Sequence, residues 1–324
     1  MNSLETVQEL IKKEIAQISY PDKPKNLYEP IHYTLELGGK RLRPALCLLA
    51  CDLFGSDIKL ALKPALGIEI FHNFTLLHDD IMDAAPIRRG KPSVHKKWNS
   101  NVAILSGDTM MALSYEYIMQ APEKLRSEVF SVFNKTAIEV CEGQQYDMNF
   151  EIQSDVSIVD YLEMIRLKTA VLLAGSLKIG GIIGGAGKED AENLYHFGEN
   201  IGIAFQLKDD LLDVFSDQDK FGKQTGGDIL SNKKTFLYLK AFELANGRTF
   251  DSLYYFFHTK PENESDKIDG VKEIYKELNI ESITLKEIDV YYQRAMQFLE
   301  KVKVSPERKT ELIKFANVLK KREF

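Results

Sequence analysis

Several features that would assign a protein class are scarce or missing in this sequence. Only 3 cysteines occur in 324 residues, Cys47, Cys51 and Cys141, and so sparse and odd a set fits reduced thiols better than a disulfide framework. No run of 18 apolar residues is present, and no basic segment followed by an apolar run opens the chain. The sequence therefore predicts a cytoplasmic protein with neither a membrane span nor a signal peptide.

An excess of positive charge is also missing. The chain has 42 lysines and arginines against 48 aspartates and glutamates, a formal net charge of −6, which argues against nucleic acid as a general partner. Neither a linker nor a low-complexity tract divides the chain. Because 44% of the residues are hydrophobic, enough for a sizeable core, we expect a single domain over residues 1–324.

What the sequence does contain is helical periodicity along most of its length. We expect helices over 3–18, 25–36, 45–54, 64–82, 101–120, 124–149, 158–185 and 189–215, with loops over 86–93, 221–234 and 261–267. Strand patterns are scarce; residues 250–257 are the best candidate, and a helix is equally compatible with them. The pattern predicts an all-α fold.

Two copies of one acidic motif are the most informative feature of the chain. Each is spaced Asp-Asp-x-x-Asp in an apolar stretch: Asp79, Asp80 and Asp83, then Asp209, Asp210 and Asp213. Residues four apart lie on nearly one face of a helix, and carboxylates there without counter-ions are too costly to be incidental. Hard oxygen ligands suit Mg²⁺, which shares its coordination with substrate phosphates, so the motifs predict a diphosphate site.

Basic side chains accompany both motifs. Arginine grips phosphate oxygens with a planar fork, lysine acts as a point charge, and glycines ahead of a helix let an anion approach the backbone. The set fits two diphosphate substrates, one bound through metal and one bound directly by cations. It consists of Lys40, Arg41 and Arg43 after two glycines, Arg88, Arg89 and Lys91 after the first motif, and Lys223 and Lys233 after the second.

In their order along the chain these motifs resemble those of the trans-isoprenyl diphosphate synthases, the polyprenyl synthetase family, from about residue 25 to 324. Each motif alone is a weak match, but the complete series is very specific. It runs Gly-Gly-Lys-Arg-Leu-Arg-Pro at 38–44, His72, His78 before the first acidic motif, Arg-Arg-Gly at 88–90, Gly-Asp at 107–108, Gly-Gln at 143–144, Lys-Thr-Ala at 168–170, Phe-Gln at 205–206 before the second, Gly-Lys at 222–223, Gly-Asp at 227–228 and Lys-Lys-Thr at 233–235.

The resemblance implies a role for each matching residue. The Mg²⁺ ligands would be Asp79, Asp83 and Asp209, supported by Asp80, Asp210 and Asp213. Isopentenyl diphosphate would be bound by Lys40, Arg43, His72 and Arg89, and the allylic diphosphate by Arg88, Lys168, Lys223 and Lys233. The allylic cation would be stabilised by Thr169, Gln206 and the Lys168 carbonyl.

The resemblance also implies the fold and the reaction. We expect one helical bundle around a central active-site cavity, working as a homodimer with three Mg²⁺ ions once substrate is bound. The reaction would condense isopentenyl diphosphate with dimethylallyl, geranyl or farnesyl diphosphate and release diphosphate. Preorganised cations would stabilise charge on the leaving diphosphate, which would then act as the base, so no side-chain nucleophile is expected.

Other interpretations leave part of the pattern unexplained. A terpene cyclase shares the bundle but normally lacks the second Asp-Asp-x-x-Asp, and a non-catalytic partner subunit would be expected to have lost site residues. A metal phosphohydrolase could have the His78-Asp79 pair but not the Gly-Gly-Lys loop. His72 alone would more often be a core histidine; it lies two helical turns before Asp79, which favours function.

Phe74 and Phe71 bear on product length. At 1.5 Å per residue they lie about 7.5 and about 12 Å before Asp79 on the same predicted helix, where aromatic rings could form the floor of a tail pocket. In the family, an aromatic residue five positions before the motif is typical of short-chain synthases. The first motif also lacks the two extra residues usual in bacterial farnesyl synthases. A geranylgeranyl (C20) product is favoured; farnesyl (C15) or a longer polyprenyl product is the alternative.

Overall fold

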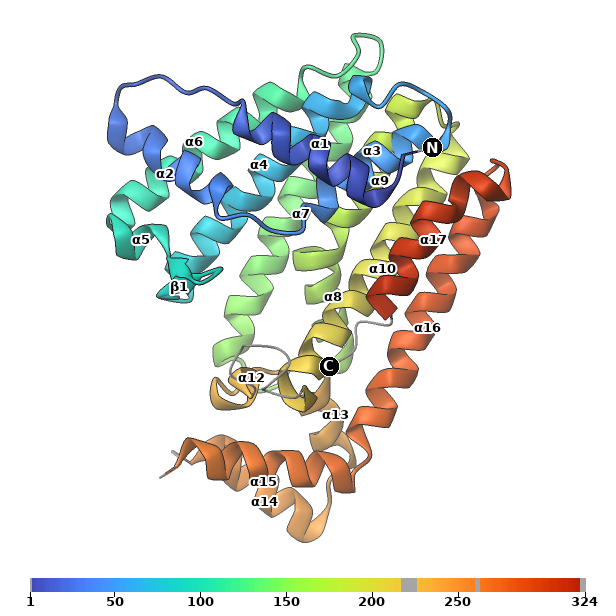
Figure 1. Cartoon of the computed structure of the whole chain (residues 1–324). Coiled ribbons are helices and arrows are strands. Elements are labelled where there is room, and N and C mark those ends of the chain that lie inside the picture. Colours follow the sequence, from blue (N-terminus) through green and yellow to red (C-terminus); the bar gives the residue numbers. More distant parts are fainter. Residues whose placement is uncertain (1, 217–225, 260–262, 321–324) are drawn as a thin grey trace. The chain divides into compact units, whose positions relative to one another are not determined.

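The computed structural model describes residues 2–216, 226–259 and 263–320, and helices dominate it (Figure 1). The all-α prediction is confirmed. The helices are α1 (Leu4–Ala16), α2 (Lys25–Glu36), α3 (Leu42–Leu53), α4 (Lys59–Met82), α5 (Val94–Lys97), α6 (Ser100–Ile118), α7 (Arg126–Ile152), α8 (Ile158–Ile165), the π-helix η1 (Arg166–Ala170), α9 (Val171–Gly184), α10 (Lys188–Phe215), α12 (Gly227–Leu230), α13 (Phe236–Leu244), α14 (Gly247–His258), α15 (Glu264–Glu277), α16 (Ile280–Lys301) and α17 (Pro306–Lys320).

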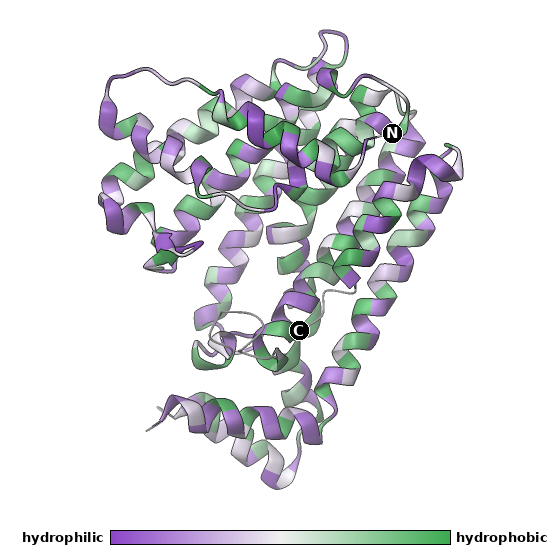
Figure 2. Ribbon diagram, viewed as in Figure 1, coloured by the Kyte–Doolittle hydropathy of each residue, from purple (hydrophilic) through white to green (hydrophobic). Residues whose placement is uncertain are grey.

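The predicted helix boundaries agree with the structure to within a few residues, because apolar residues recur at helical spacing (Figure 2). The ambiguous stretch 250–257 lies in helix α14, not in a strand. The predicted helix 158–185 is divided by η1, where the backbone widens for one turn. Within the predicted loop 261–267, α15 begins at Glu264.

A short hairpin replaces part of the predicted loop 86–93. Strands β1 (Ile87–Arg88) and β2 (Lys91–Pro92) pair antiparallel. The two residues between them, Arg89 and Gly90, have φ of 54° and 76°. A turn with two positive φ values has the twist of a tight hairpin, and glycine adopts that conformation without a Cβ penalty. The loop prediction was therefore wrong for these four strand residues.

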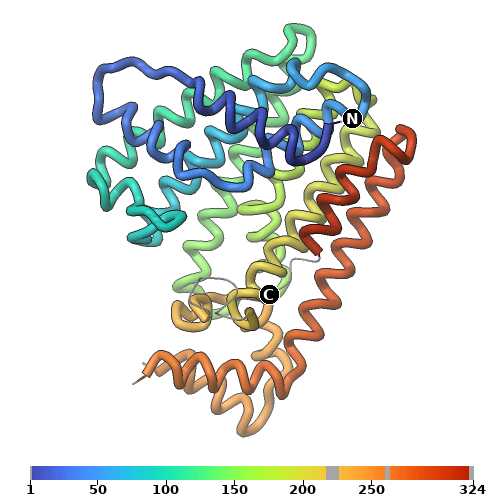
Figure 3. The backbone as a smooth tube through the Cα atoms, viewed as in Figure 1, coloured from blue at the N-terminus to red at the C-terminus, as the bar shows by residue number. Residues whose placement is uncertain are grey.

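The chain forms two compact units. The first comprises Met1–Lys135, Gly175–Tyr195 and Val302–Leu312. In it α4 packs closely on α6, since a Cβ on Gly67 would stand 2.9 Å from the Ser114 carbonyl oxygen. The chain returns to α3 through α9, where a Cβ on Gly180 would stand 2.0 Å from the Cys47 carbonyl oxygen (Figure 3). Because glycine has no side chain, these two positions allow the helices to approach each other closely.

The second unit comprises Thr136–Ala174, His196–Lys301 and Ile313–Phe324. Its core is a continuous apolar cluster from α8, α10 and α12 to α16, with Tyr161, Leu207, Leu237 and Tyr275 almost fully buried. The expectation of one domain over residues 1–324 stays a prediction.

Burial distinguishes the three cysteines and explains one long apolar helix. Cys47 and Cys51 are buried, whereas Cys141 is exposed. Among the described residues, the segment Ile158–Gly184 is long and apolar enough to span a membrane. However, 83% of its apolar 18-residue stretch is buried inside the protein. A buried core helix passes the same test of length and composition.

Candidate active site

The first acidic motif lies at the C-terminal end of α4. The helix ends at Met82, and Asp83 is its C-cap residue with helical φ and ψ. Asp79 is half-buried and Asp83 exposed, whereas only 4% of Asp80 is exposed. The spacing therefore places Asp80 on the inner side of the helix and the other two aspartates nearer to solvent.

Asp80 holds Arg88 of the hairpin. Its Oδ1 accepts hydrogen bonds from Nε (2.9 Å) and Nη2 (2.5 Å) of Arg88, whose Nη2 is also 3.8 Å from Asp79 Oδ2. Burial alone would lower the pKa of Arg88, but the hydrogen bond and charge of Asp80 outweigh it and raise that pKa. This pair fixes a predicted diphosphate-binding arginine beside the predicted metal ligands.

Arg43 and His72 lie together, as their predicted shared role requires. Arg43 Nη1 is 3.1 Å from His72 Nε2. Arginine can only donate, so Nε2 of His72 accepts and its proton is on Nδ1. Burial and the neighbouring arginines, Arg43 first among them, hold the pKa of His72 well below its usual value. Burial also lowers the pKa of Arg43 to about 10, so Arg43 remains charged while His72 is neutral.

The hairpin turn places Arg89 against the glycine pair ahead of α3. Arg89 Nη1 donates to the Gly38 carbonyl. A Cβ on Gly39 would stand 2.8 Å from the Arg89 guanidinium carbon, and Gly39 has a φ of 125°. Glycine is favoured at position 39 by this conformation, and a side chain there would also displace the Arg89 guanidinium. Lys40 follows and is exposed, with its carbonyl accepting a hydrogen bond from Gln8.

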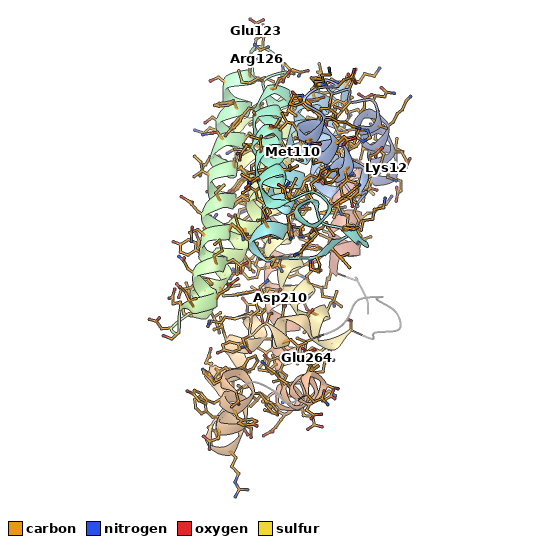
Figure 4. The ribbon with its side chains drawn as sticks, turned by 90° about the vertical axis from the view of Figure 1, so that its left-hand side faces the viewer. Lys12, Met110, Glu123, Arg126, Asp210 and Glu264 are labelled. Carbon is orange, nitrogen blue, oxygen red and sulfur yellow. The ribbon has the colours of Figure 1, made fainter. Side chains whose placement is uncertain are left out.

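The second acidic motif lies near the C-terminal end of α10, where Asp210 is labelled in Figure 4. As in the first motif, the middle aspartate is the buried one: Asp210 is 6% exposed, while Asp209 and Asp213 are half-buried. The Asp210 carboxylate accepts from the hydroxyl of Tyr161 and from Gln206 Nε2 (2.9 Å). Burial raises the pKa of Asp210 although the Tyr161 hydrogen bond opposes it.

A polar chain connects this carboxylate to η1. Gln206 Oε1 accepts from Thr169 Oγ1 at 3.0 Å, so the two predicted cation-stabilising side chains are bonded to each other. Lys168, the preceding residue of η1, lies 2.5 Å from Asp147 Oδ2. Asp147 was not predicted as a site residue, and its neighbour Gln144 of the Gly-Gln motif was the only local signal.

The π-helical turn that carries Lys168 and Thr169 is packed between two glycines. A Cβ on Gly143 of α7 would stand 2.2 Å from the Lys168 backbone nitrogen. A Cβ on Gly202 of α10 would stand 2.5 Å from the Ala170 Cα. Such turns are rare and are frequently found at functional sites.

Asp213 organises the segment that follows the second motif. Its Oδ2 accepts from the Asp228 N–H at 2.9 Å, and its carbonyl accepts from the Gly226 N–H at 2.7 Å. Asp228 was not predicted as a site residue. Burial first, then the charges of Asp210, Asp213 and Asp147, raises its pKa to about 7.

Of the two lysines predicted after the second motif, the structure describes one. Lys233 is exposed, and its charge favours the ionised carboxylates of Asp210 and Asp228. Lys223 lies outside the described residues. The structure therefore brings Arg43, His72, Arg88 and Arg89 together in the first unit, with Lys40 exposed nearby in the sequence. It brings Lys168, Thr169, Gln206 and Lys233 together around the second motif.

Comparison with known proteins decides the family. The sequence model described as polyprenyl synthetase matches residues 24–278 of this chain. The chain belongs to the polyprenyl synthetase family. This polyprenyl synthetase is thus an all-α trans-prenyltransferase, the enzyme class of its family, and the predicted prenyl chain elongation is confirmed.

Individual relatives support the assignment. A geranylgeranyl diphosphate synthase from Methanosarcina mazei is 44% identical over 223 residues, 68% of this chain and 69% of that protein. A geranylfarnesyl diphosphate synthase from Natronomonas pharaonis is 39% identical over 253 residues, 72% and 74% of the two chains. A solved geranylgeranyl pyrophosphate synthase superimposes with a TM-score of 0.94 at 42% identity, covering 100% of both chains. Another, from Pyrococcus horikoshii, has a TM-score of 0.92 at 35% identity, covering 99% and 97%.

The residues of this polyprenyl synthetase fit the Mg²⁺ on which its family depends. Burial first, and then the charges of neighbouring carboxylates, raises the pKa of Asp228 to about 7, and a divalent cation at the second motif would favour the ionised carboxylates. Among the described residues no three His, Cys, Asp or Glu side chains form a ready-made metal cage. Mg²⁺ needs none, because it is usually held by one or two carboxylates, waters and substrate phosphates.

Proposed function

We propose that this polyprenyl synthetase condenses isopentenyl diphosphate with an allylic diphosphate and that its product is geranylgeranyl diphosphate (C20). The observation that supports the proposal is that the sequence retains both complete acidic motifs and every predicted substrate cation. Relatives named geranylgeranyl diphosphate synthase, at 44% and 42% identity, support the product. The geranylfarnesyl diphosphate synthase relative, at 39%, makes a longer product the principal alternative.

The two acidic motifs would act on the allylic substrate. We propose that Asp79, Asp83 and Asp209 bind Mg²⁺, three ions in all with substrate present, and that Asp80, Asp210 and Asp213 support them. When bound, Mg²⁺ neutralises charge on the diphosphate oxygens. Arg88, aimed by Asp80, would stabilise the same charge as it develops on the leaving group, together with Lys168, Lys223 and Lys233.

The side chains around η1 would act on the carbon skeleton. Thr169 Oγ1 and Gln206 Oε1 form one hydrogen-bonded pair, and oxygen dipoles near an allylic cation stabilise it. Lys40, Arg43, His72 and Arg89 would hold isopentenyl diphosphate directly, with the Nδ1–H of neutral His72 as a donor. The isopentenyl double bond then attacks the cation, and the departing diphosphate accepts the proton that is lost.

Three wider features are also proposed from the family resemblance: one domain over residues 1–324, a cytoplasmic location and a homodimer. An apolar stripe on α7 supports the dimer, because Ile138, Met148 and Ile152 are 52%, 40% and 91% exposed. Size-exclusion chromatography with light scattering would test it, and a monomer at micromolar concentration would contradict it.

An omission panel tests the reaction class. The purified chain is incubated with Mg²⁺ and isopentenyl diphosphate alone, with each allylic diphosphate alone, and with both, and each mixture is repeated with a chelator. The proposal expects prenyl product only when both substrates and Mg²⁺ are present. A hydrocarbon from the allylic substrate alone would indicate a cyclase instead. Activity only after a second protein is added would indicate a partner subunit.

A further inference from the structure

A buried ionic network lies directly behind the predicted isopentenyl residues. Arg41 and Glu69 form an ion pair in which the side chains are only 4% and 2% exposed. Asn73 adds its amide, with Nδ2 donating to Glu69 Oε1 and to the Glu69 carbonyl, both at 2.8 Å. The proposed mechanism uses none of these three residues.

The network ties together three helices. Arg41 precedes α3 and has a left-handed backbone, with φ 48° and ψ 39°. Its Nη1 donates to Glu69 on α4, and its Nη2 donates to the Leu35 carbonyl near the end of α2. The forked guanidinium makes the two bonds through separate nitrogens held in one rigid plane. The first turn of α3 is therefore fixed in register against α4.

A second arginine contact lies beside the first. Arg43 is two residues beyond Arg41, and it bonds His72, three residues beyond Glu69 on α4. The side chains of Arg43 and Glu69 each keep one buried atom without a hydrogen-bond partner, Arg43 Nε and Glu69 Oε2. The charge of Glu69 also favours the protonated form of Arg43, opposing burial, which lowers the pKa of Arg43.

We propose that Glu69, held by Arg41 and Asn73, is a positioning residue that aims Arg43 and His72 at the diphosphate of isopentenyl diphosphate. The inference rests on the proposed function, because it names what orients that substrate site. It also gives a reason for burying a carboxylate among arginines. Buried charges must be paired, and pairing here locks the backbone from which Arg43 projects.

The affinity of a Glu69→Gln variant for isopentenyl diphosphate distinguishes a role of Glu69 through its charge from a role through its position. Glu69→Gln keeps the shape of the side chain but removes one negative charge from an arginine-rich region. If Glu69 acted through charge alone, isopentenyl diphosphate would bind more tightly to the variant. If Glu69 positions Arg43 and His72, binding weakens, because a neutral amide holds Arg41 less firmly.

Steady-state kinetics with each substrate varied decide between these outcomes. For Glu69→Gln the proposal expects KM for isopentenyl diphosphate to rise about tenfold or more, with kcat and the allylic KM within about threefold of wild type. Arg41→Lys should move the same KM in the same direction, since lysine keeps the charge but not the fork. An unchanged or lower isopentenyl KM in Glu69→Gln would overturn the proposal.

Two further variants separate positioning from folding. Glu199→Gln is the matched control, because Glu199 also accepts from an arginine, Arg166 at 3.2 Å, but belongs to the second unit, whereas the predicted isopentenyl residues belong to the first. It should leave the isopentenyl KM unchanged. If Glu69→Gln does not fold, Asn73→Ala decides, with an isopentenyl KM at least about threefold higher expected and no change contradicting the proposal. A wild-type chain that does not consume isopentenyl diphosphate would instead refute the proposed function.

Discussion

The middle aspartate of each motif differs from its neighbours in its surroundings. Asp80 and Asp210 are 4% and 6% exposed and accept hydrogen bonds from Arg88 and from Tyr161 with Gln206. The outer aspartates lie nearer to solvent. The six carboxylates are therefore not equivalent: two orient protein groups that would touch substrate, and the others are better placed to meet a metal ion.

Kinetics should separate the two substrate sites at this scale. Arg43→Ala and His72→Ala should mainly raise KM for isopentenyl diphosphate, because they remove groups that bind it directly. Asp79→Ala and Asp209→Ala should mainly lower kcat, by about a hundredfold or more, because charge on the leaving diphosphate is no longer neutralised. If Asp209→Ala kept turnover within about threefold, a loss below ~1 kcal/mol, its role as a metal ligand would be wrong.

The neutral state of His72 predicts a pH dependence of stability. Its pKa in the folded protein is held well below its usual value, whereas an unfolded histidine titrates near 6.5. Below about pH 6.5 the unfolded state binds a proton that the folded state does not, so folding is progressively disfavoured as pH falls. Replacing His72 by Gln should reduce the fall in unfolding free energy between pH 7.5 and 5.5 by about 1 kcal/mol.

Urea unfolding of metal-free protein at the two pH values measures this difference. His32→Gln is the control, because the His32 side chain is 53% exposed. It should not lessen the dependence on pH. The same slope in His72→Gln and wild type would show that His72 is not held neutral by its surroundings.

At the scale of the element, the turn η1 is the feature that determines how α8 and α9 present Lys168 and Thr169. Hydrophobic periodicity predicts a continuous helix over 158–185, because one widened turn does not change which positions are apolar.

The hairpin at 87–92 was not predicted for a different reason. Arginine rarely adopts a left-handed backbone, so the residue type at position 89 gives no sign of the turn. Asp147 had only the nearby Gly-Gln motif as a signal, and Asp228 belonged to the Gly-Asp motif at 227–228 but was given no role, because its carboxylate neighbours become evident only in the structure. The long helices and both acidic motifs were predictable, since each depends on local spacing alone.

Gly143→Ala should damage both stability and catalysis. The new Cβ would stand 2.2 Å from a backbone nitrogen, which cannot move without shifting η1. We expect a loss of about 1–3 kcal/mol of stability, as for overpacking, and at least a tenfold lower kcat. Gly187→Ala is the control, because nothing lies within 4 Å of its Cβ position. Melting and turnover equal to those of the control would show that the close contact is unimportant.

Product length should depend on the aromatic residues of α4. Phe74 is half-buried, whereas Phe71 is fully buried, 5.4 Å from the ring of Phe133. Phe74 is thus the more accessible ring, and Phe74→Ala should lengthen the product by at least one isoprene unit. Phe71→Ala should do the same with a larger loss of stability, about 3–5 kcal/mol. If neither variant, nor the pair, changed the product distribution, the floor of the tail pocket would have to come from other residues.

At the scale of the whole molecule, each unit carries one acidic motif with its own cations. The first unit holds Arg43, His72, Arg88 and Arg89 near the first motif, and the second holds Lys168 and Lys233 near the second. Catalysis as proposed requires both sets to act on the same pair of substrates. Membership of the polyprenyl synthetase family supports joint action of the two sets, and formation of an elongated product by the intact chain would demonstrate it.

The chain length of that product is the clearest evidence for or against C20 prenyl elongation by this protein. The purified chain is supplied with Mg²⁺, isopentenyl diphosphate and either dimethylallyl, geranyl or farnesyl diphosphate, and the dephosphorylated products are separated against prenyl alcohol standards. We expect geranylgeraniol as the main alcohol from every primer that is accepted, with little beyond C25. A main product of C15, or of C25 and longer, would contradict the assigned length, and no elongation of any primer would contradict the assigned reaction.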